Sequence, residues 1–252
     1  MTGAEPAVTA DIPDVLLRDP CYLEILIPAL DEATRLPNTL DRTVRYLEAQ
    51  PYSSSVVVID NDSVDKTTDV VARMRSARVP VYLTGCARPG KGAAVRRGML
   101  TSRARYVGYM DADLATPVET LDTVLPLLSQ WQVVVGSRRA GGARLAVRQP
   151  PIRTLGGMVF RVMARQVLPG VADTQCGFKF FAGDLARTVA GRLRVDGFAF
   201  DVELLRAVTD MGFPVKEVPV VWSDGPGSRL RVLTDGTRTA ADLFLLARSR
   251  MS

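Results

Sequence analysis

The chain has 252 residues, of which 47% are hydrophobic and 23% charged, and its formal net charge is +5. This length suits one well-cored α/β domain or two small ones, and the modest, dispersed positive charge suits an anionic small molecule or membrane surface rather than nucleic acid. The sequence contains no histidine, which excludes Ser-His-Asp, Cys-His and histidine-based metal catalysis.

The cysteines and the apolar runs indicate the compartment. Cys21, Cys86 and Cys176 lie far apart and form no Cys-x-x-Cys pair, so we expect reduced thiols, as in a cytosolic protein. No run approaches the roughly 18 apolar residues that span a bilayer, and the first residues lack the pattern of a signal peptide. We therefore expect a cytoplasmic protein, either free in solution or in peripheral contact with the inner face of a membrane.

Strands and helices alternate through the first half of the chain. Residues 1–20 are rich in Ala, Pro and Asp and are predicted to form a flexible leader. The expected strands cover 22–27, 56–59, 79–83, 106–110 and 133–136, and the expected helices cover 36–47, 65–75, 91–102 and 118–128. This alternation predicts a single α/β domain with a mostly parallel, Rossmann-like sheet flanked by helices.

The rhythm changes after Gly136. Residues 138–151 are rich in Arg, Gly and Pro, which predicts a mobile loop. The predicted helix over 152–168 combines an apolar stripe with several arginines, and it either packs that stripe on the core or rests on an anionic membrane surface. Further along we expect a strand over 178–181, a helix over 201–211, a strand over 215–222 and a short apolar helical segment over 243–247.

Two carboxylates follow the strand that ends at Met110. Asp111 and Asp113 are separated by one residue, and Pro117 soon breaks the chain direction. Carboxylate oxygens are the ligands that Mg²⁺ and Mn²⁺ prefer, and such a cation can in turn hold a diphosphate. Taken alone, the pair could equally cap the next helix.

The other strand ends carry residues of related chemistry. They are Pro28-Ala29-Leu30-Asp31-Glu32, Asp60-Asn61-Asp62-Ser63, Gly90-Lys91-Gly92 and Gly136-Ser137-Arg138. Ligands of parallel sheets bind beyond the carboxyl ends of the strands, where carboxylates could accept hydrogen bonds from a base or ribose. The Gly-Lys-Gly run leads into a helix, so we expect free N–H groups and a cation for phosphate. Turns favour these residues too, but agreement at five strand ends predicts a nucleotide site.

These motifs resemble the family 2 glycosyltransferases of the GT-A fold, and most of all their dolichyl-phosphate β-glucosyltransferase and polyprenyl-phosphate glycosyltransferase branch. The segments that carry the resemblance are 27–32, 59–67, 90–96, 111–117, 173–179, 198–203 and 217–222. The resemblance implies an inverting, metal-dependent hexosyltransferase that moves a sugar, glucose in this branch, from a UDP-sugar to a polyprenyl phosphate. It also implies Mg²⁺ or Mn²⁺ as the cofactor.

The resemblance assigns roles residue by residue. The implied donor-binding residues are Pro28, Ala29, Leu30, Glu32, Asp60, Asp62, Lys91, Asp111, Ala112 and Asp113, with Asp113 and Asp111 at the metal. The implied catalytic residues are Asp173, Asp201 and Glu203. Asp173 would position or deprotonate the acceptor, unless it only caps its loop. Arg138, Arg148 and Arg153 would bind an acceptor phosphate.

On this basis the chain divides into a leader (1–20), a nucleotide-sugar-binding half (21–137), an acceptor-binding and catalytic half (138–235) and a helical tail (236–252). We expect the 138–151 loop to close over the donor. Three alternatives stay open: transfer to a soluble sugar or natural-product precursor, a non-catalytic sugar-nucleotide sensor, and a nucleotidyltransferase. The last would need a basic Gly-rich loop after the first strand, which residues 28–32 do not provide.

Overall fold

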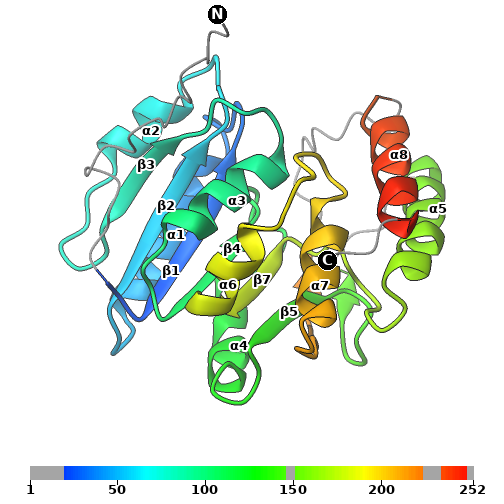
Figure 1. The fold of residues 1–252 in the computed structure, drawn as a ribbon. Coiled ribbons are helices and arrows are strands. Elements are labelled where there is room, and N and C mark those ends of the chain that lie inside the picture. Colours follow the sequence, from blue (N-terminus) through cyan, green and yellow to red (C-terminus); the bar gives the residue numbers. More distant parts are fainter. Residues whose placement is uncertain (1–19, 146–150, 224–233, 249–252) are drawn as a thin grey trace, which may run out of the picture.

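A seven-stranded sheet forms the centre of the protein (Figure 1). The structure is a computed structural model and describes residues 20–145, 151–223 and 234–248, so the predicted leader lies outside the described residues. The strands of the sheet, in spatial order, are β3 (Val81–Gly85), β2 (Ser54–Asp60), β1 (Leu23–Ala29), β4 (Tyr106–Met110), β7 (Phe178–Ala182), β5 (Val133–Ser137) and β8 (Lys216–Pro219).

The sheet is parallel except at β7. The pairs β1–β2, β1–β4, β2–β3 and β5–β8 are parallel, whereas β7 lies antiparallel between β4 and β5. Phe178, the first residue of β7, is therefore paired with Met110, the last residue of β4. Because of this one reversal, the segment that precedes β7 meets the carboxyl ends of β4 and β5 at one edge of the sheet.

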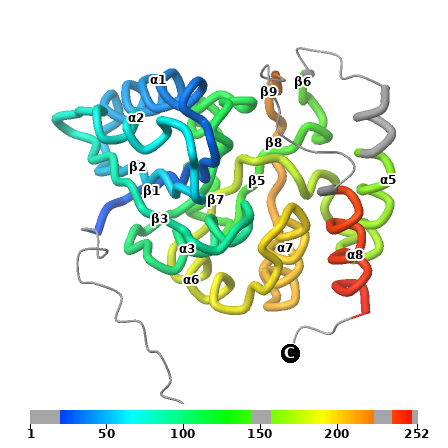
Figure 2. Tube along the Cα trace, turned by 90° about the horizontal axis from the view of Figure 1, so that it is seen from above, coloured from blue at the N-terminus to red at the C-terminus, as the bar shows by residue number. Residues whose placement is uncertain are grey.

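Helices cover both faces of the sheet (Figure 2). On one side lie α1 (Leu36–Glu48), α2 (Thr67–Arg73) and α4 (Leu121–Leu127), the last preceded by the short 3₁₀ helix η2 (Val118–Thr120); on the other lie α3 (Lys91–Thr101), α6 (Gly183–Ala190) and α7 (Phe200–Asp210). In β2, Val56 and Val58 face the first layer, and Val57 and Ile59 face the second. This run is fully buried on both faces, as its β-branched composition predicts. The predicted single-domain α/β fold is confirmed.

Two helices stand beside this core. The structure has α5 over Pro151–Val167 and α8 over Thr234–Arg248, and the two lie side by side in both views of the backbone (Figures 1 and 2). Ala164 of α5 packs with Leu243 and Leu246 of α8 against Ala199 and Val202 of the α7 region. The tail helix is thus longer than the short apolar segment that the sequence indicated, because its polar first turns also fold.

The region after β5 differs most from the expectation. The predicted strand over 215–222 divides after Pro219 into β8 and β9 (Val221–Trp222), and β9 pairs with β6 (Arg144–Leu145) in a small second sheet. The first part of the predicted mobile loop is therefore hydrogen-bonded structure, while residues 146–150 lie outside the described part. Within the described residues, no helix has the length and apolar character that crossing a membrane requires.

Candidate active site

The loops after β1 and β2 are joined into one structure. The N–H of Asp31 donates to the Ser63 hydroxyl (2.8 Å), and that of Glu32 donates to Thr67 Oγ1 (2.7 Å). In return, Asp31 Oδ1 accepts from the N–H of Val64 (2.8 Å). The predicted donor residues Ala29 and Asp60 are register partners at the ends of their strands, so the first two motifs form one side of the site.

Asp60 holds an unsatisfied buried oxygen at this end. Its Oδ2 accepts from the N–H of Ser63 (3.3 Å), whereas its Oδ1 is buried without a hydrogen-bond partner. Asp62 is exposed nearby, and it adopts a positive φ of 68°, as do Asp31 (51°) and Leu114 (53°). Left-handed backbone at residues other than glycine costs energy and concentrates at ligand sites, so three strand ends share the marks of a binding edge.

The loop before α3 is built differently from the prediction. Gly90 has φ 121°, and a side chain there would overlap the Asp196 carbonyl, which an ideal Cβ would approach to 2.2 Å. That carbonyl accepts from the N–H groups of Gly92 (2.7 Å) and Ala93 (3.3 Å). The expectation of free N–H groups for a phosphate is therefore wrong for these two residues. Asn61 fixes the loop by accepting from the N–H of Gly90 (2.7 Å).

Lys91 meets the first carboxylate of the Asp-x-Asp pair. Its Nζ lies 2.6 Å from Asp111 Oδ1, and its side chain is only 18% exposed. Burial would lower the pKa of Lys91, but the charges of Asp111 and Asp201 outweigh burial and raise it. Asp111 is also clamped from behind, since an ideal Cβ on Gly177 would fall 1.9 Å from Asp111 Oδ2. Only glycine fits at position 177 with this carboxylate in place.

Asp113 is the second carboxylate of the pair. Its Oδ1 accepts from the N–H of Ala115 (3.0 Å), and burial together with the charge of Asp111 raises its pKa. Between them, the carbonyl of Ala112 accepts from Thr39 Oγ1 of α1 (2.6 Å), which fixes the turn. Two hard carboxylates on a rigid turn suit Mg²⁺ or Mn²⁺. No cluster of three or more His, Cys, Asp or Glu side chains is placed to hold a metal in the described ranges.

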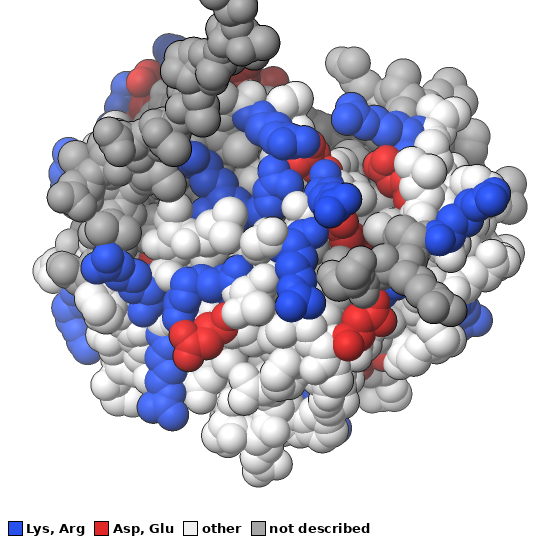
Figure 3. All heavy atoms as spheres, in the orientation of Figure 1, with Lys and Arg blue, Asp and Glu red and all other residues white. Residues whose placement is uncertain are grey.

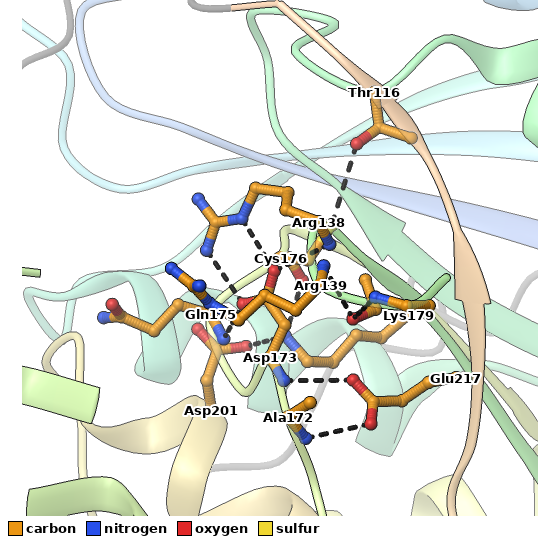
Figure 4. Close-up of polar contacts among 12 residues, drawn as sticks. Thr116, Arg138, Arg139, Ala172, Asp173, Gln175, Cys176, Lys179, Asp201 and Glu217 are labelled. Carbon is orange, nitrogen blue, oxygen red and sulfur yellow. Dashed lines mark hydrogen bonds and ion pairs between the residues drawn. The ribbon is translucent and has the colours of Figure 1, made fainter. Parts of the chain in front are cut away.

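Asp173 and Arg138, predicted for catalysis and acceptor binding, form a two-pronged ion pair (Figure 4). Arg138 Nε donates to Asp173 Oδ2 (2.7 Å), and its Nη2 donates to Oδ1 (2.8 Å). Burial would raise the pKa of Asp173, but the bonds and charge of Arg138 outweigh it and lower the pKa to about 2. A carboxylate of this kind is a weak proton acceptor, so the geometry favours a positioning role over that of a general base.

Glu217 of β8 holds the Asp173 segment from the other side. Its Oε1 accepts from the N–H of Asp173 (3.0 Å) and its Oε2 from that of Ala172 (2.9 Å). Arg138 also lies over the Trp222 ring, with its guanidinium carbon 5.4 Å from the centroid. Asp173 is thus fixed by β5, β8 and β9 together, which is why its position depends on the fold rather than on local sequence.

Asp201, the second predicted catalytic residue, lies in a buried ion pair. Lys179 Nζ of β7 donates to its Oδ1 (2.5 Å) and to the carbonyl of Cys176 (2.6 Å). The Tyr109 hydroxyl donates to the same carboxylate. Lys179 is completely buried and Asp201 nearly so. This cluster adjoins Lys91, because the ammonium groups of Lys91 and Lys179 both lie over the Tyr109 ring, at 5.7 and 5.3 Å from its centroid.

Within the described part of the chain, Glu203, the third predicted catalytic residue, forms no ion pair of the kind that Asp173 and Asp201 form. Its carboxylate accepts from the N–H groups of Arg194 (3.0 Å) and Val195 (2.8 Å), in the loop that precedes α7. That loop also supplies the Asp196 carbonyl that holds the start of α3. Glu203 therefore holds this loop in place in the structure, and it contacts the start of α3 only through the loop.

Among the predicted acceptor residues only Arg138 has a described side chain, since Arg148 and the side chain of Arg153 lie outside the described part. A further arginine, Arg161 of α5, has its pKa lowered by burial and by the charges of Arg139 and Arg138. The positive charges of Arg138 and Arg139 therefore reach Arg161. In Figure 3, Lys and Arg side chains gather in the upper middle of the visible face, with acidic side chains between them.

Several supporting residues were missed by sequence reasoning. Asn61, Lys179 and Glu217 were read only as parts of motifs, and Tyr109 and Arg161 as ordinary members of a strand and a helix. A lysine inside the apolar run Phe178-Lys179-Phe180-Phe181 is the one available signal, because a buried ammonium needs a carboxylate partner. Which carboxylate it meets is decided by the antiparallel insertion of β7.

Comparisons with known proteins agree with this architecture. The family profile described as Glycosyl transferase family 2 matches residues 24–186. A Dictyostelium discoideum protein named dolichyl-phosphate beta-glucosyltransferase is 30% identical over 241 residues, covering 89% of this chain and 73% of that protein. A human protein of the same name is 31% identical over 241 residues, covering 89% of this chain and 74% of that protein.

A solved structure has a similar fold. It is glucosyl-3-phosphoglycerate synthase from Mycobacterium tuberculosis, in complex with Mn²⁺, UDP and glucosyl-3-phosphoglycerate. Its TM-score is 0.68 at 16% sequence identity, and the match covers 98% of this chain and 86% of that chain. The prediction of a glycosyltransferase with the GT-A fold is confirmed. With its family profile, its relatives and its fold in agreement, this chain is a glycosyltransferase that belongs to family 2.

Proposed function

We propose that this glycosyltransferase moves glucose, with inversion, from UDP-glucose to a polyprenyl (dolichyl-type) phosphate. The observation that carries the proposal is the shared name of relatives from Dictyostelium discoideum, Drosophila melanogaster and human, each at least 30% identical and aligned with 89% of this chain. Charged groups on both sides of the site support it, because each suits one part of such a reaction.

The donor would bind at the ends of β1, β2 and β4. The unpaired Oδ1 of Asp60 is a suitable acceptor for the N–H of a uracil ring, since a bound donor group would satisfy it. Exposed Asp62 suits ribose hydroxyls, and the ammonium of Lys91 suits the diphosphate. These assignments follow the predicted donor residues and remain proposals.

Asp113 and Asp111 would hold the Mg²⁺ or Mn²⁺. The residues fit such an ion, because Mg²⁺ sites commonly use one or two carboxylates together with substrate phosphate oxygens. When bound, the ion would neutralise the charge that develops on the departing diphosphate. The chain's own contribution is to keep the two carboxylates apart and fixed, through Thr39 at Ala112 and Gly177 behind Asp111.

The acceptor phosphate would bind at the arginines. Asp173 takes two of the five N–H donors of the Arg138 guanidinium, so this side chain can keep its ion pair and still bind a phosphate. The charges of Arg138 and Arg139 disfavour the positive charge of Arg161, and an anion bound at these arginines would relieve that repulsion. A phosphate oxygen is already ionised near neutral pH, so the attack on the sugar would need no strong base. Asp173 would then orient Arg138 rather than remove a proton.

The lipid chain would lie toward α5 and α8, in peripheral contact with a membrane. Exposed apolar residues occur on both helices: Met158, Val159 and Val162 on α5 and Phe244 and Leu245 on α8 are each more than half exposed. Val159 and Val162, which belong to the apolar stripe of the predicted 152–168 helix, therefore do not pack on the core, and the membrane alternative gains support. Co-sedimentation with anionic vesicles should weaken in Val162→Asp, whereas Thr188→Asp on α6 should leave it unchanged.

The test of the function is the product. The purified protein, with Mg²⁺, is given radiolabelled UDP-glucose and a polyprenyl phosphate in detergent or, separately, water-soluble sugar acceptors. We expect label in the organic phase only with the polyprenyl phosphate, and less with UDP-galactose. Label appearing only in a soluble product would contradict the lipid acceptor and establish the soluble alternative.

The acceptor arginines allow a finer test. Arg161→Ala should raise the KM for the polyprenyl phosphate about 10-fold, as expected for losing a charged hydrogen bond, with little change in the KM for the donor. Arg165→Ala, four residues further along the same helix and exposed, is the matched control. Equal effects of the two variants would remove Arg161 from the acceptor site.

A further inference from the structure

The contact between Lys91 and Asp111 has a consequence for how a cation enters the site. The Lys91 ammonium lies 2.6 Å from Asp111 Oδ1, so a divalent ion bound to that oxygen would have a full positive charge directly beside it. A divalent ion binds a carboxylate oxygen at a still shorter distance, about 2.1 Å for Mg²⁺. The two positive charges therefore compete for one oxygen.

Asp111 cannot turn away to serve both. Its Oδ2 is packed against Gly177, and its backbone N–H donates to the Gly177 carbonyl (3.1 Å). Two further carboxylates act on Lys91: Asp201, which already receives Lys179 and the Tyr109 hydroxyl, and Asp113, which accepts from the N–H of Ala115. Asp111 is therefore the principal partner of Lys91. Of the two side chains in this ion pair, the carboxylate is the one that packing holds in place.

Lys91, by contrast, has room to move. A cavity of about 130 Å³ adjoins it, lined by Gly90, Phe198 and, from α8, Arg238 and Asp242. Its Nζ also lies 5.7 Å from the centroid of Tyr109 and 5.9 Å from that of Phe200, contacts that guide the side chain without fixing it. A long, flexible lysine can leave a rigid carboxylate at little conformational cost.

We propose that Lys91 is an internal counter-cation, which holds Asp111 in the free enzyme and yields it to the divalent ion only when a nucleoside diphosphate offers the ammonium a new partner. The idea rests on the proposed function for the identity of that diphosphate. Cation binding thereby depends on the nucleotide, since the ion alone must displace Lys91 without compensation. When the ion and the diphosphate bind together, Asp111 pairs with the ion and the Lys91 ammonium pairs with the diphosphate.

The test measures Mn²⁺ binding without nucleotide, by the loss of the electron paramagnetic resonance signal of free Mn²⁺. Lys91→Met should bind Mn²⁺ alone about tenfold more tightly than the wild type, because a competing unit charge is removed. Lys91→Arg, which keeps the charge, should resemble the wild type. Lys216→Met is the matched control: it removes the same charge at the first residue of β8, an edge strand three places from β4 in the sheet.

With UDP present the order should reverse, and Lys91→Met should bind Mn²⁺ and UDP about tenfold more weakly than the wild type. Unchanged or weaker binding of Mn²⁺ alone by Lys91→Met, compared with the wild type, would overturn the proposal. Binding of Mn²⁺ by Lys91→Arg as tight as that by Lys91→Met would also overturn it. Lys91→Gln, which keeps a hydrogen-bond donor for Asp111, replaces Lys91→Met if the latter does not fold. Absence of UDP binding in every protein would contradict the proposed function, while the measurement with Mn²⁺ alone would still decide the role of Lys91.

Discussion

Carboxylates at the two ends of the site are used in different ways. At the ends of β1 and β2, Asp60 keeps one buried oxygen unpaired and Asp62 is exposed, and at the end of β4 Asp111 is held by Lys91 alone among the described cations. On the side of β5, β7 and β8, Asp173, Asp201, Glu203 and Glu217 each hold a cation or backbone N–H groups. The donor end thus retains acceptors for a ligand, whereas the acceptor end uses its acids to hold arginines and loops in place.

The difference has an energetic side. An unpaired buried acceptor costs about 1–3 kcal/mol, which the donor end bears in the free protein and would recover on binding. A buried ion pair adds little stability over apolar packing, but breaking it is costly because one charge is left alone. Substitution of the donor-end carboxylates should therefore act on binding, and substitution of the acceptor-end carboxylates or of their ion-pair partners should act on the fold.

The largest effect is expected at Asp113. Asp113→Asn removes a charge from the Asp-x-Asp pair, and kcat/KM should fall about 1,000-fold, because several kcal/mol of charge stabilisation at the leaving diphosphate depend on the metal. The melting temperature should change little. Steady-state kinetics with varied Mn²⁺ is the measurement, and Asp184→Asn on the exposed side of α6 is the control. A variant that keeps normal turnover would show that the acids of the donor end serve the fold after all.

A change in stability is expected at Arg138. Arg138→Met leaves the buried carboxylate of Asp173 without its cation and should lower the free energy of unfolding by about 3 kcal/mol. Arg139→Met, at the exposed neighbouring position, should stay within about 0.5 kcal/mol of the wild type. Urea unfolding at pH 7 gives both values. If Arg138→Met and Arg139→Met lowered the free energy of unfolding equally, the acids of the acceptor end would not stabilise the fold through their ion pairs.

The pH dependence of the same pair has a definite sign. The pKa of Asp173 is lowered from 3.8 to about 2, so its ion pair contributes stability fully above pH 3.8 and loses it as the pH falls toward 2. The stability difference between wild type and Arg138→Met should therefore shrink over this interval. A difference that stays constant down to pH 2 would mean that Asp173 gains nothing from Arg138.

A smaller effect is expected at Asp60. Asp60→Asn removes the charge from an acceptor that the free protein leaves unpaired, so UDP binding should weaken about tenfold, within the range for a charged hydrogen bond. The melting temperature should stay the same or rise, because an unsatisfied charge has gone. Calorimetry measures the UDP affinity and thermal unfolding measures the stability. Asp69→Asn, at an exposed position of α2, is the control. Loss of stability without loss of binding would place Asp60 among the structural acids.

The same contrast explains what could be predicted from sequence. The sheet, its flanking helices and the donor end follow from runs such as Val56–Ile59 and from residues that stand directly after strands. The acceptor end depends on contacts between segments far apart in the chain, such as Arg138 with Asp173 and Glu217 with Ala172. No periodicity reports that β7 runs antiparallel or that Glu203 turns toward Arg194, so a motif could name these residues without giving their partners.

Glu203 provides the smallest expected effect on turnover. In Glu203→Gln an amide replaces a carboxylate that accepts from the N–H groups of Arg194 and Val195, so one donor faces another and stability should fall by about 1–2 kcal/mol. Glu203 reaches the start of α3 only indirectly, through the loop that supplies the Asp196 carbonyl. We therefore expect kcat to change by less than about threefold. A loss of about 1,000-fold in kcat, with unchanged KM values and stability, would restore the catalytic role that the motif suggested. The acceptor end would then contain at least one acid that acts on the reaction itself.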